Sequence, residues 1–107
     1  MAAEHKIEIY LTKKAKEHGF LCYKFKSPGI NGVPDRILMG HGITFFVETK
    51  APGEVPRAQQ CKRHKEMQDH GAIVYVIDNK EDIDALFTDN EIRKIKMALK
   101  QNLKQSY

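Results

Sequence analysis

Residues 34–50 read PDRILMGHGITFFVETK, and this stretch decides the fold. Two of its segments, 36–39 and 43–50, are rich in aliphatic, β-branched and aromatic residues, which favour strands. They are joined by Gly40-His41-Gly42, a link that is short enough and rich enough in glycine to form a tight turn. The stretch therefore predicts a β-hairpin.

The hairpin brings polar side chains from its two open ends together. Alternate side chains of a strand share a face, so Glu48 and Lys50 point the same way while Thr49 points the other way. Asp35 stands at the start of the partner strand, opposite the far end of the second strand. We therefore expect two carboxylates and one ammonium group at the same end of the sheet.

Each fragment of this group has a simpler explanation, since an isolated Glu-x-Lys usually forms a surface ion pair and a Pro-Asp pair usually begins a turn. Here, however, Phe45-Phe46-Val47 leads directly into Glu48, so polar residues end a strand that is otherwise buried. Such a group suits metal-assisted phosphodiester hydrolysis, because Mg²⁺ uses few carboxylates and leaves positions for water and phosphate oxygens. A neighbouring lysine can orient the water or stabilise the anionic transition state.

Outward from the hairpin, apolar periodicity and turn residues predict the remaining elements. Residues 27–34, with two prolines and two glycines, predict a loop over the charged group. The almost wholly apolar segment 72–77 predicts a strand buried on both faces. Thr88 to Glu91 has the form of a capping box. The other expected elements are helices at 4–18, from Pro56 to about His70, and at 80–87, a strand at 20–26, and a last helix after the capping box.

The order α-β-β-β-α-β-α-α predicts an α/β fold in which a mixed sheet is flanked by helices. With 107 residues the chain is expected to form one core. No apolar run approaches the roughly 18–20 residues of a membrane-spanning helix, and residues 1–6 lack the apolar segment of a signal peptide. Cys22 and Cys61 make no disulfide framework, so a reducing intracellular setting is expected.

Positive charge is concentrated in residues 89–107, which we treat as a separate unit from a nuclease-like domain at 1–88. The whole chain carries a net charge of +4, and this segment has five cations against two anions. A basic amphipathic helix is expected here, packed on the domain or on a dimer partner. Its outer face could be merely solvated or could contact a polyanion. The apolar stripe consists of Ile92, Ile95, Leu99 and Leu103, and the cations are Arg93, Lys94, Lys96, Lys100 and Lys104.

Several motifs extend this pattern beyond the hairpin. They are Ile7-Glu8-x-Tyr10-Leu11, Leu21-Cys22-Tyr23-Lys24-Phe25, Ser27-Pro28-Gly29, Gly32-Val33-Pro34-Asp35-Arg36, Phe46-Val47-Glu48-Thr49-Lys50-Ala51-Pro52-Gly53, Pro56-Arg57-x-x-Gln60, and Gly71 with Val74-Tyr75-Val76-Ile77-Asp78. Together they resemble the virus-type replication-repair nuclease (VRR-NUC) family of the PD-(D/E)xK superfamily. The resemblance implies a restriction-endonuclease-like fold, α-β-β-β-α-β, followed here by the C-terminal helices. It covers the chain up to about residue 88.

The resemblance also implies a metal-dependent nuclease with Mg²⁺ as its cation and Mn²⁺ as a substitute. It implies metal-binding carboxylates at Asp35 and Glu48, the Thr49 backbone carbonyl as a further ligand, the catalytic lysine at Lys50, and a supporting glutamine at Gln60. From its sequence neighbours alone, Gln60 would be assigned to the surface. Thr49 departs from the family, in which a larger apolar residue is commoner, but its side chain is expected to face away from the site.

A glutamate of the first helix is implied as a further catalytic and metal-binding residue. Glu4 and Glu8 are one helical turn apart and share a face. Glu8 stands eleven residues before Gly19-Phe20, a spacing that resembles archaeal junction-resolving nucleases, so Glu8 is favoured and Glu4 is the alternative.

The expected partner is branched or duplex DNA, with no small-molecule cofactor and no membrane. Stand-alone members of the family resemble homodimeric enzymes that resolve Holliday junctions, and small versions are typical of phages and prophages in the bacterial cytoplasm. The alternatives are a flap- or nick-type nuclease and a non-catalytic DNA-binding module on the same fold. The candidate DNA contacts are Lys26, Ser27, Asn31, Arg36, Arg57, Lys96 and Lys100.

Overall fold

The hairpin that the sequence predicts is present in a computed structural model of the chain. The structure describes residues 2–105, and their side chains up to residue 102. Strand β2 (Arg36–Gly40) pairs antiparallel with β3 (Ile43–Thr49). The two linking residues, His41 and Gly42, have φ of 53° and 79°. Positive φ at both central residues is typical of the type I′ turn, a two-residue hairpin turn whose twist matches that of the flanking strands.

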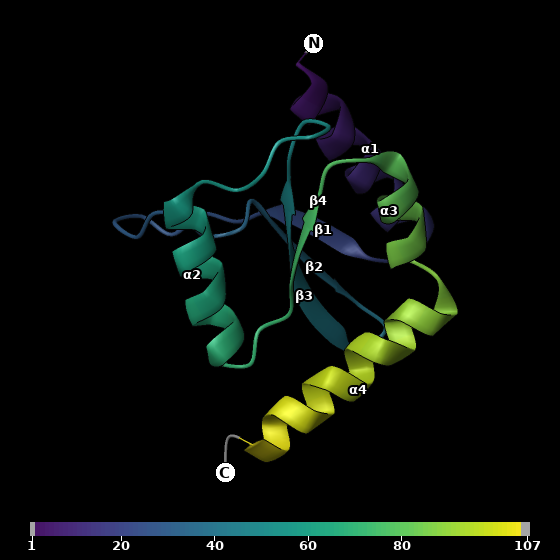
Figure 1. Cartoon of the computed structure of the whole chain (residues 1–107). Coiled ribbons are helices and arrows are strands. Elements are labelled where there is room, and N and C mark those ends of the chain that lie inside the picture. Colours follow the sequence, from purple (N-terminus) through teal and green to yellow (C-terminus); the bar gives the residue numbers. More distant parts are fainter. Residues whose placement is uncertain (1, 106–107) are drawn as a thin grey trace.

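Two further strands complete a mixed sheet in the order β1-β2-β3-β4 (Figure 1). Strand β1 (Leu21–Lys24) is antiparallel to β2, and β4 (Val74–Ile77) is parallel to β3. A two-residue turn joins β2 to β3, and the longer segment 25–35 joins β1 to β2, whereas the parallel pair is joined by a crossover through a helix. The α/β fold class with a mixed sheet, expected from the order of elements, is confirmed.

Helices cover both faces of the sheet. Helix α2 (Ala58–Asp69) lies on one face, and α1 (Ala3–Glu17), α3 (Lys80–Leu86) and α4 (Asp89–Gln105) lie on the other (Figure 1). The hydrophobic core lies between the sheet and the three-helix layer. Its most deeply buried side chains are Leu11, Leu38, Phe45, Val47, Ile83 and Ile95. None of the helices among residues 2–105 is both long enough and apolar enough to span a bilayer.

Helix α4 turns its apolar stripe inward. Ile95 is 2% exposed and belongs to the core, and Ile92 and Leu99 pack partly buried against it. The side chains of Leu103 and Lys104 lie outside the described residues. Among the described residues, the stripe is therefore buried at Ile95 and partly covered by this chain's own domain at Ile92 and Leu99.

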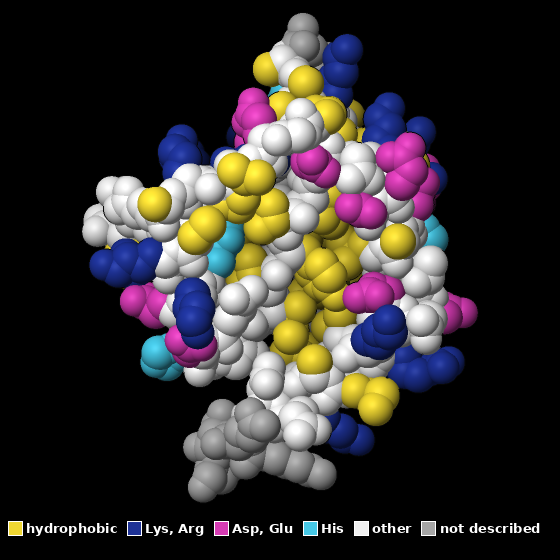
Figure 2. Space-filling view, in the orientation of Figure 1, with side chains coloured by type: hydrophobic (Ala, Val, Ile, Leu, Met, Phe, Trp, Pro, Cys, Tyr) yellow, Lys and Arg dark blue, Asp and Glu magenta, His cyan; other side chains and the backbone are white. Residues whose placement is uncertain are grey.

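Three local expectations are corrected. Strand β4 is not buried on both faces: it ends the sheet, and Val76 is 43% exposed. Hydrophobic side chains gather there in a hollow between α2 and the α3–α4 pair (Figure 2). Pro56 precedes α2, whose N-cap is Arg57. At the start of α4 only half of the capping box forms, because the Glu91 carboxylate accepts a hydrogen bond from the Tyr75 hydroxyl (2.7 Å).

We predict that Leu38→Ala will lower the free energy of unfolding by about 2–5 kcal/mol, because it opens a cavity in the sheet's core face. Leu38 is 0% exposed, whereas Met97 on α4 is 66% exposed. Met97→Ala is therefore the control and should cost far less. Urea denaturation followed by circular dichroism measures both, and equal losses would contradict this description of the core.

Candidate active site

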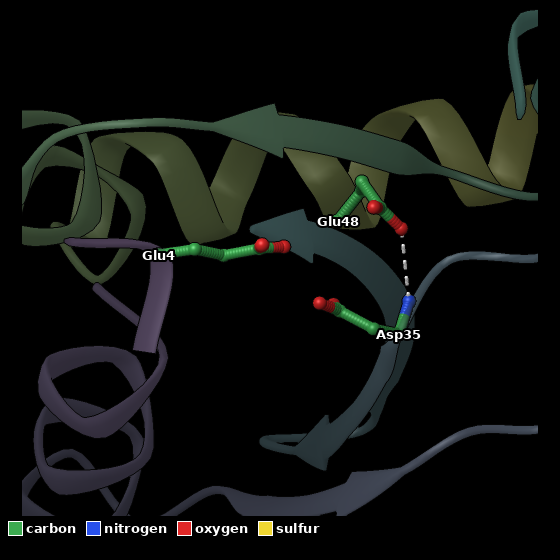
Figure 3. A group of neighbouring side chains, drawn as sticks. All are labelled: Glu4, Asp35 and Glu48. Atoms are coloured by element: carbon green, nitrogen blue, oxygen red, sulfur yellow. Dashed lines mark hydrogen bonds between the residues drawn. The ribbon is translucent and has the colours of Figure 1, made fainter. Parts of the chain in front are cut away.

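Three carboxylates meet at the end of the sheet where β3 finishes. Glu4 comes from the first turn of α1, Asp35 from the residue before β2, and Glu48 from β3 (Figure 3). Each offers an oxygen, and these oxygens all lie within 4.8 Å of one another. In Figure 3 the Glu4 side chain extends from α1 toward the other two. An acidic cluster is therefore assembled from three separate elements.

The hairpin register brings Asp35 and Glu48 together. Arg36 is paired with Val47, so Asp35, one residue earlier, lies opposite Glu48. The Asp35 backbone N–H donates to Glu48 Oε1 (3.2 Å), and the Asp35 carbonyl accepts from the Phe25 N–H (2.8 Å). Asp35 is thus fixed by its backbone between β3 and the residue that follows β1.

Glu48 is the most connected of the three acids. Its Oε2 accepts a hydrogen bond from the Gln60 amide (3.0 Å) and lies 3.5 Å from the Lys50 ammonium nitrogen. Gln60 is itself fixed, because its Oε1 accepts from the Arg57 backbone N–H at the start of α2 (2.9 Å). Glu48, Lys50 and Gln60 are all buried. The structure therefore brings together the strand acid, the lysine and the glutamine that the resemblance implied.

Burial dominates the electrostatics of this cluster. Burial, together with the neighbouring Asp35 carboxylate, raises the pKa of Glu48 to about 7, against the lowering effect of Lys50. Burial also raises the pKa of Asp35, against the lowering effect of its hydrogen bonds from Thr49. The negative charge of the cluster is therefore only partly compensated by the protein.

The geometry favours Glu4, the alternative named above, over Glu8 as the first-helix acid of this cluster. Glu8 lies one turn further along α1 and forms an ion pair with the Arg36 guanidinium, outside the carboxylate group. The same contact disfavours Arg36 as a DNA contact, since its side chain is 12% exposed and its charge is paired within the protein. Glu4 and Glu8 share one face of the helix, so the spacing to Gly19-Phe20 could not show which of them reaches the cluster.

The expectation that Thr49 faces away from the site is also wrong. Its hydroxyl donates to Asp35 Oδ2 (2.8 Å), and its backbone N–H lies 3.3 and 3.4 Å from the two Asp35 carboxylate oxygens. Strand alternation does put Thr49 on the opposite face from Glu48. Asp35, however, precedes the first paired residue of β2, so its side chain need not follow the alternation of the strands.

A cleft of about 420 Å³ opens over the acids, and residues of the 27–34 loop line it, as predicted. The loop is fastened to α2: the Arg63 side chain donates to the Asn31 carbonyl (2.9 Å), and a Cβ on Gly32 would come within 2.7 Å of the Gln59 carbonyl oxygen. Four of the expected DNA contacts line the cleft, namely Lys26, Ser27, Asn31 and Arg57.

Lys96 and Lys100 are not part of this cleft. With Arg93 they line a separate pocket of about 520 Å³ beside the hairpin turn, where β3 begins at Ile43. The acidic cluster is at the other end of the same strand, around Glu48. The structure therefore places the basic helix and the candidate site at opposite ends of β3.

Two comparisons with known proteins agree with this geometry. The chain is 40% identical over 79 residues to "Putative nuclease p44" of Acyrthosiphon pisum secondary endosymbiont phage 1, which is 73% of this chain and 85% of that protein. A solved VRR-NUC domain superposes with a TM-score of 0.74 at 26% identity, over 80% of this chain and 95% of that one.

This chain belongs to the VRR-NUC nuclease family. No family sequence model matches it, so the assignment rests on the phage relative and on the fold. The resemblance drawn from the motifs is confirmed, and the cluster described above occupies the cleft of a VRR-NUC nuclease fold.

The raised pKa of Glu48 predicts how the stability of the metal-free nuclease depends on pH. The folded protein holds the Glu48 proton more tightly than the unfolded chain, whose pKa is the ordinary 4.5. The stability that this proton contributes is therefore full below pH 4.5 and is lost as the pH rises through about 7. In EDTA, the melting temperature should fall more between pH 5 and pH 8 for wild type than for Glu48→Gln.

Calorimetry at both pH values measures the difference, with Glu81→Gln as the control for removing a solvent-exposed carboxylate. Glu81→Gln should keep the wild-type pH dependence. An identical fall in wild type and Glu48→Gln would contradict the raised pKa of Glu48.

Proposed function

We propose that this VRR-NUC nuclease is a DNA endonuclease that requires a divalent cation, with Mg²⁺ as the cofactor and Mn²⁺ as a substitute. The observation that carries the proposal is the convergence of Glu4, Asp35 and Glu48 beside the buried Lys50. Three carboxylates within 4.8 Å repel one another when ionised, and burial strengthens that repulsion. A hard cation relieves it, and an all-oxygen donor set is the kind that Mg²⁺ and Mn²⁺ prefer.

The proposed ligands are the three carboxylates and the Thr49 backbone carbonyl. When bound, the cation supplies positive charge that offsets the charge developing on the phosphoryl oxygens and makes a neighbouring water more acidic. The protein's own part is to keep the donors in place: Gln60 and the Asp35 N–H hold the two oxygens of Glu48. Lys50, next to Glu48, orients the attacking water or stabilises the anionic transition state.

The cleft supports DNA as the substrate. Lys26 and Arg57 bring positive charge to its rim, and Ser27 and Asn31 add polar groups that can contact phosphate. Lys96 and Lys100 lie at the other end of β3, so we propose that they contact a part of the DNA substrate that is distant from the cleaved phosphodiester bond. The phage relative supports action in the cytoplasm of a bacterial host, from a phage or prophage gene.

We further propose that the enzyme is a homodimer that resolves Holliday junctions or other branched DNA. One active centre can cut one strand at a time, whereas resolution needs two opposed cuts, which two-fold symmetry supplies. Since α4 already packs Ile95 into the core of its own domain, we propose that another apolar surface forms the interface.

We propose the exposed part of the sheet as that surface. Leu21 and Tyr23 of β1 are 52% and 54% exposed. Their partners on β2 are Met39 and Ile37, so all four side chains lie on the face opposite the buried Leu38. Helix α2 covers the β4 side of that face, as its contacts show, and the β1 side is left accessible. A second copy packed there would bury this patch, which we call the β1–β2 face.

The first prediction of this proposal concerns catalysis. Purified protein should cut branched DNA with Mg²⁺ or Mn²⁺ and not in EDTA. Asp35→Ala and Glu48→Ala should lose both metal binding and cleavage, whereas Lys50→Ala should retain metal and DNA binding and lose cleavage. Glu4→Gln should lower activity by about 10- to 100-fold, since it removes one metal ligand.

Glu8→Gln is the matched control on the same helix face, because the amide oxygen can still accept from Arg36. It should leave the dependence on Mg²⁺ concentration close to that of wild type. Undiminished cutting by the Lys50 variant, or a larger loss from Glu8→Gln than from Glu4→Gln, would overturn these assignments.

The second prediction concerns the dimer. Light scattering at micromolar concentration should give twice the mass of one chain for wild type. Leu21→Asp combined with Tyr23→Asp should shift the protein to monomer without unfolding it, because both side chains are already half exposed. Val76→Asp, at the opposite edge of the sheet, is the control and should leave the dimer intact.

Cleavage of labelled four-way junction, flap and nicked duplex then separates the substrates. Paired cuts in the junction by the dimer, and single cuts by the monomeric variant, support resolution. A wild-type protein that is monomeric both free and on junction DNA would overturn the dimer and favour flap or nick cleavage.

A further inference from the structure

Thr49 makes a set of contacts that the roles assigned above do not use. Among the described residues, all hydrogen bonds to the Asp35 carboxylate come from Thr49. The hydroxyl contact to Oδ2 is the shortest at 2.8 Å, and the backbone N–H reaches Oδ1 and Oδ2 at 3.3 and 3.4 Å. The orientation of this acid is therefore set by one residue.

The contact joins the two sides of the sheet. Thr49 is 0% exposed and faces the core layer, on the same side as Val47, while Glu48 faces the side covered by α2. Asp35 is held by its backbone opposite Glu48, and its side chain meets the Thr49 hydroxyl. Thr49, which is buried and faces the core, thus holds the carboxylate of Asp35, which lines the cleft.

The hydrogen bonds leave part of the Asp35 carboxylate available. A carboxylate has two oxygens with about four lone-pair sites. The Thr49 hydroxyl uses one site on Oδ2, and Oδ1 receives only the longer N–H contact. The same carboxylate offers an oxygen within 4.8 Å of those of Glu4 and Glu48. The hydroxyl therefore fixes one side of the group while lone pairs remain open to the cluster.

We propose that Thr49 is a positioning residue, whose hydroxyl holds the Asp35 carboxylate in the orientation in which it binds the divalent cation. The role rests on the proposed function, since it requires a cation at the cluster. Rotation of an aspartate carboxylate about χ2 meets only a broad, shallow barrier. A short hydrogen bond from a buried side chain removes that freedom before the cation arrives, so less ordering remains to be done on binding.

The alternative is that the contact serves stability alone, because a buried hydroxyl needs an acceptor. The two roles differ in what a substitution changes. A stabilising role would alter the melting temperature and leave the metal affinity of the folded protein unchanged. A positioning role would alter the metal affinity even where the fold is as stable as wild type.

Two substitutions with opposite effects separate these roles. Thr49→Val keeps the volume and removes the hydroxyl, while Thr49→Ser keeps the hydroxyl and removes a methyl group. The backbone N–H contacts stay in both. We expect Mn²⁺ affinity, measured by titration calorimetry without DNA, to weaken by about 10- to 100-fold in Thr49→Val, as for other groups that hydrogen-bond a metal ligand. Thr49→Ser should bind Mn²⁺ nearly as wild type does, even if its melting temperature is lower.

Two further measurements and a control variant complete the test. DNA affinity in EDTA should be the same in both variants and in wild type, and the Mg²⁺ concentration for half-maximal cleavage should rise only in Thr49→Val. Thr44→Val, an exposed threonine of the same strand, is the control and should change none of these quantities.

The outcomes distinguish this inference from the function on which it rests. Wild type that binds Mn²⁺, with Thr49→Val equal to it, would overturn the role of Thr49 alone. Equal weakening in Thr49→Val and Thr49→Ser would likewise overturn it, because the hydroxyl would not be the cause. Wild type that neither binds Mn²⁺ nor cuts DNA with it would overturn the proposed function and this inference together.

Discussion

The register of the β2–β3 hairpin is the constraint on which the candidate site depends. It sets Arg36 against Val47, and hence Asp35 against Glu48. A slip of one residue would turn Glu48 and Lys50 into the core and bring Val47 and Thr49 out of it. The apolar side chains on the core face oppose such a slip, since Leu38, Phe45 and Val47 are at most 1% exposed. The packing that stabilises the fold therefore also aligns the site.

Once the register is set, the acids are placed where water cannot fully solvate them. The Glu48 carboxylate sits at the end of a central strand, under the first turn of α2 and beside Lys50. The hydrogen bonds from Gln60 and the Asp35 N–H satisfy its oxygens but do not remove its charge. The pKa of Glu48 is raised because its buried negative charge is only partly compensated. A buried carboxyl group of this kind is most stable when it is protonated or when a bound cation balances its charge. The fold is thus suited to the divalent cation proposed for it.

The neighbouring pair of Glu8 and Arg36 shows how differently similar residues can be used. Glu8 lies one turn beyond Glu4 on the same helix, yet its charge is balanced within the protein by the guanidinium. Glu4 has no such partner among the described residues and extends toward Asp35 and Glu48 (Figure 3). The structure thus separates an acid that supports the packing of α1 on the sheet from one that faces the cleft.

Much of this could be predicted from local patterns. The order of elements, the hairpin and the proximity of Asp35, Glu48 and Lys50 follow from strand periodicity and turn residues, which act over a few neighbouring positions. Gln60 needed the resemblance, because its polar neighbours in the first turn of a helix give no sign of burial. Strand β4 was expected to be covered on both faces because an apolar run does not show whether a neighbouring strand exists.

The sequence by itself determined the fold class and the acids and lysine of the hairpin, because these depend on the order of elements and on alternation and spacing along the chain. The family followed from the resemblance of motifs spread over most of the chain. The tertiary structure decided that Glu4 rather than Glu8 joins the cluster, that Arg36 is paired within the protein, and that Thr49 holds Asp35. It also placed Ile95 of the α4 stripe in the core of the same chain. Each of these depends on the angle and depth at which separate elements pack, and contacts between distant residues leave no periodic signal in the chain.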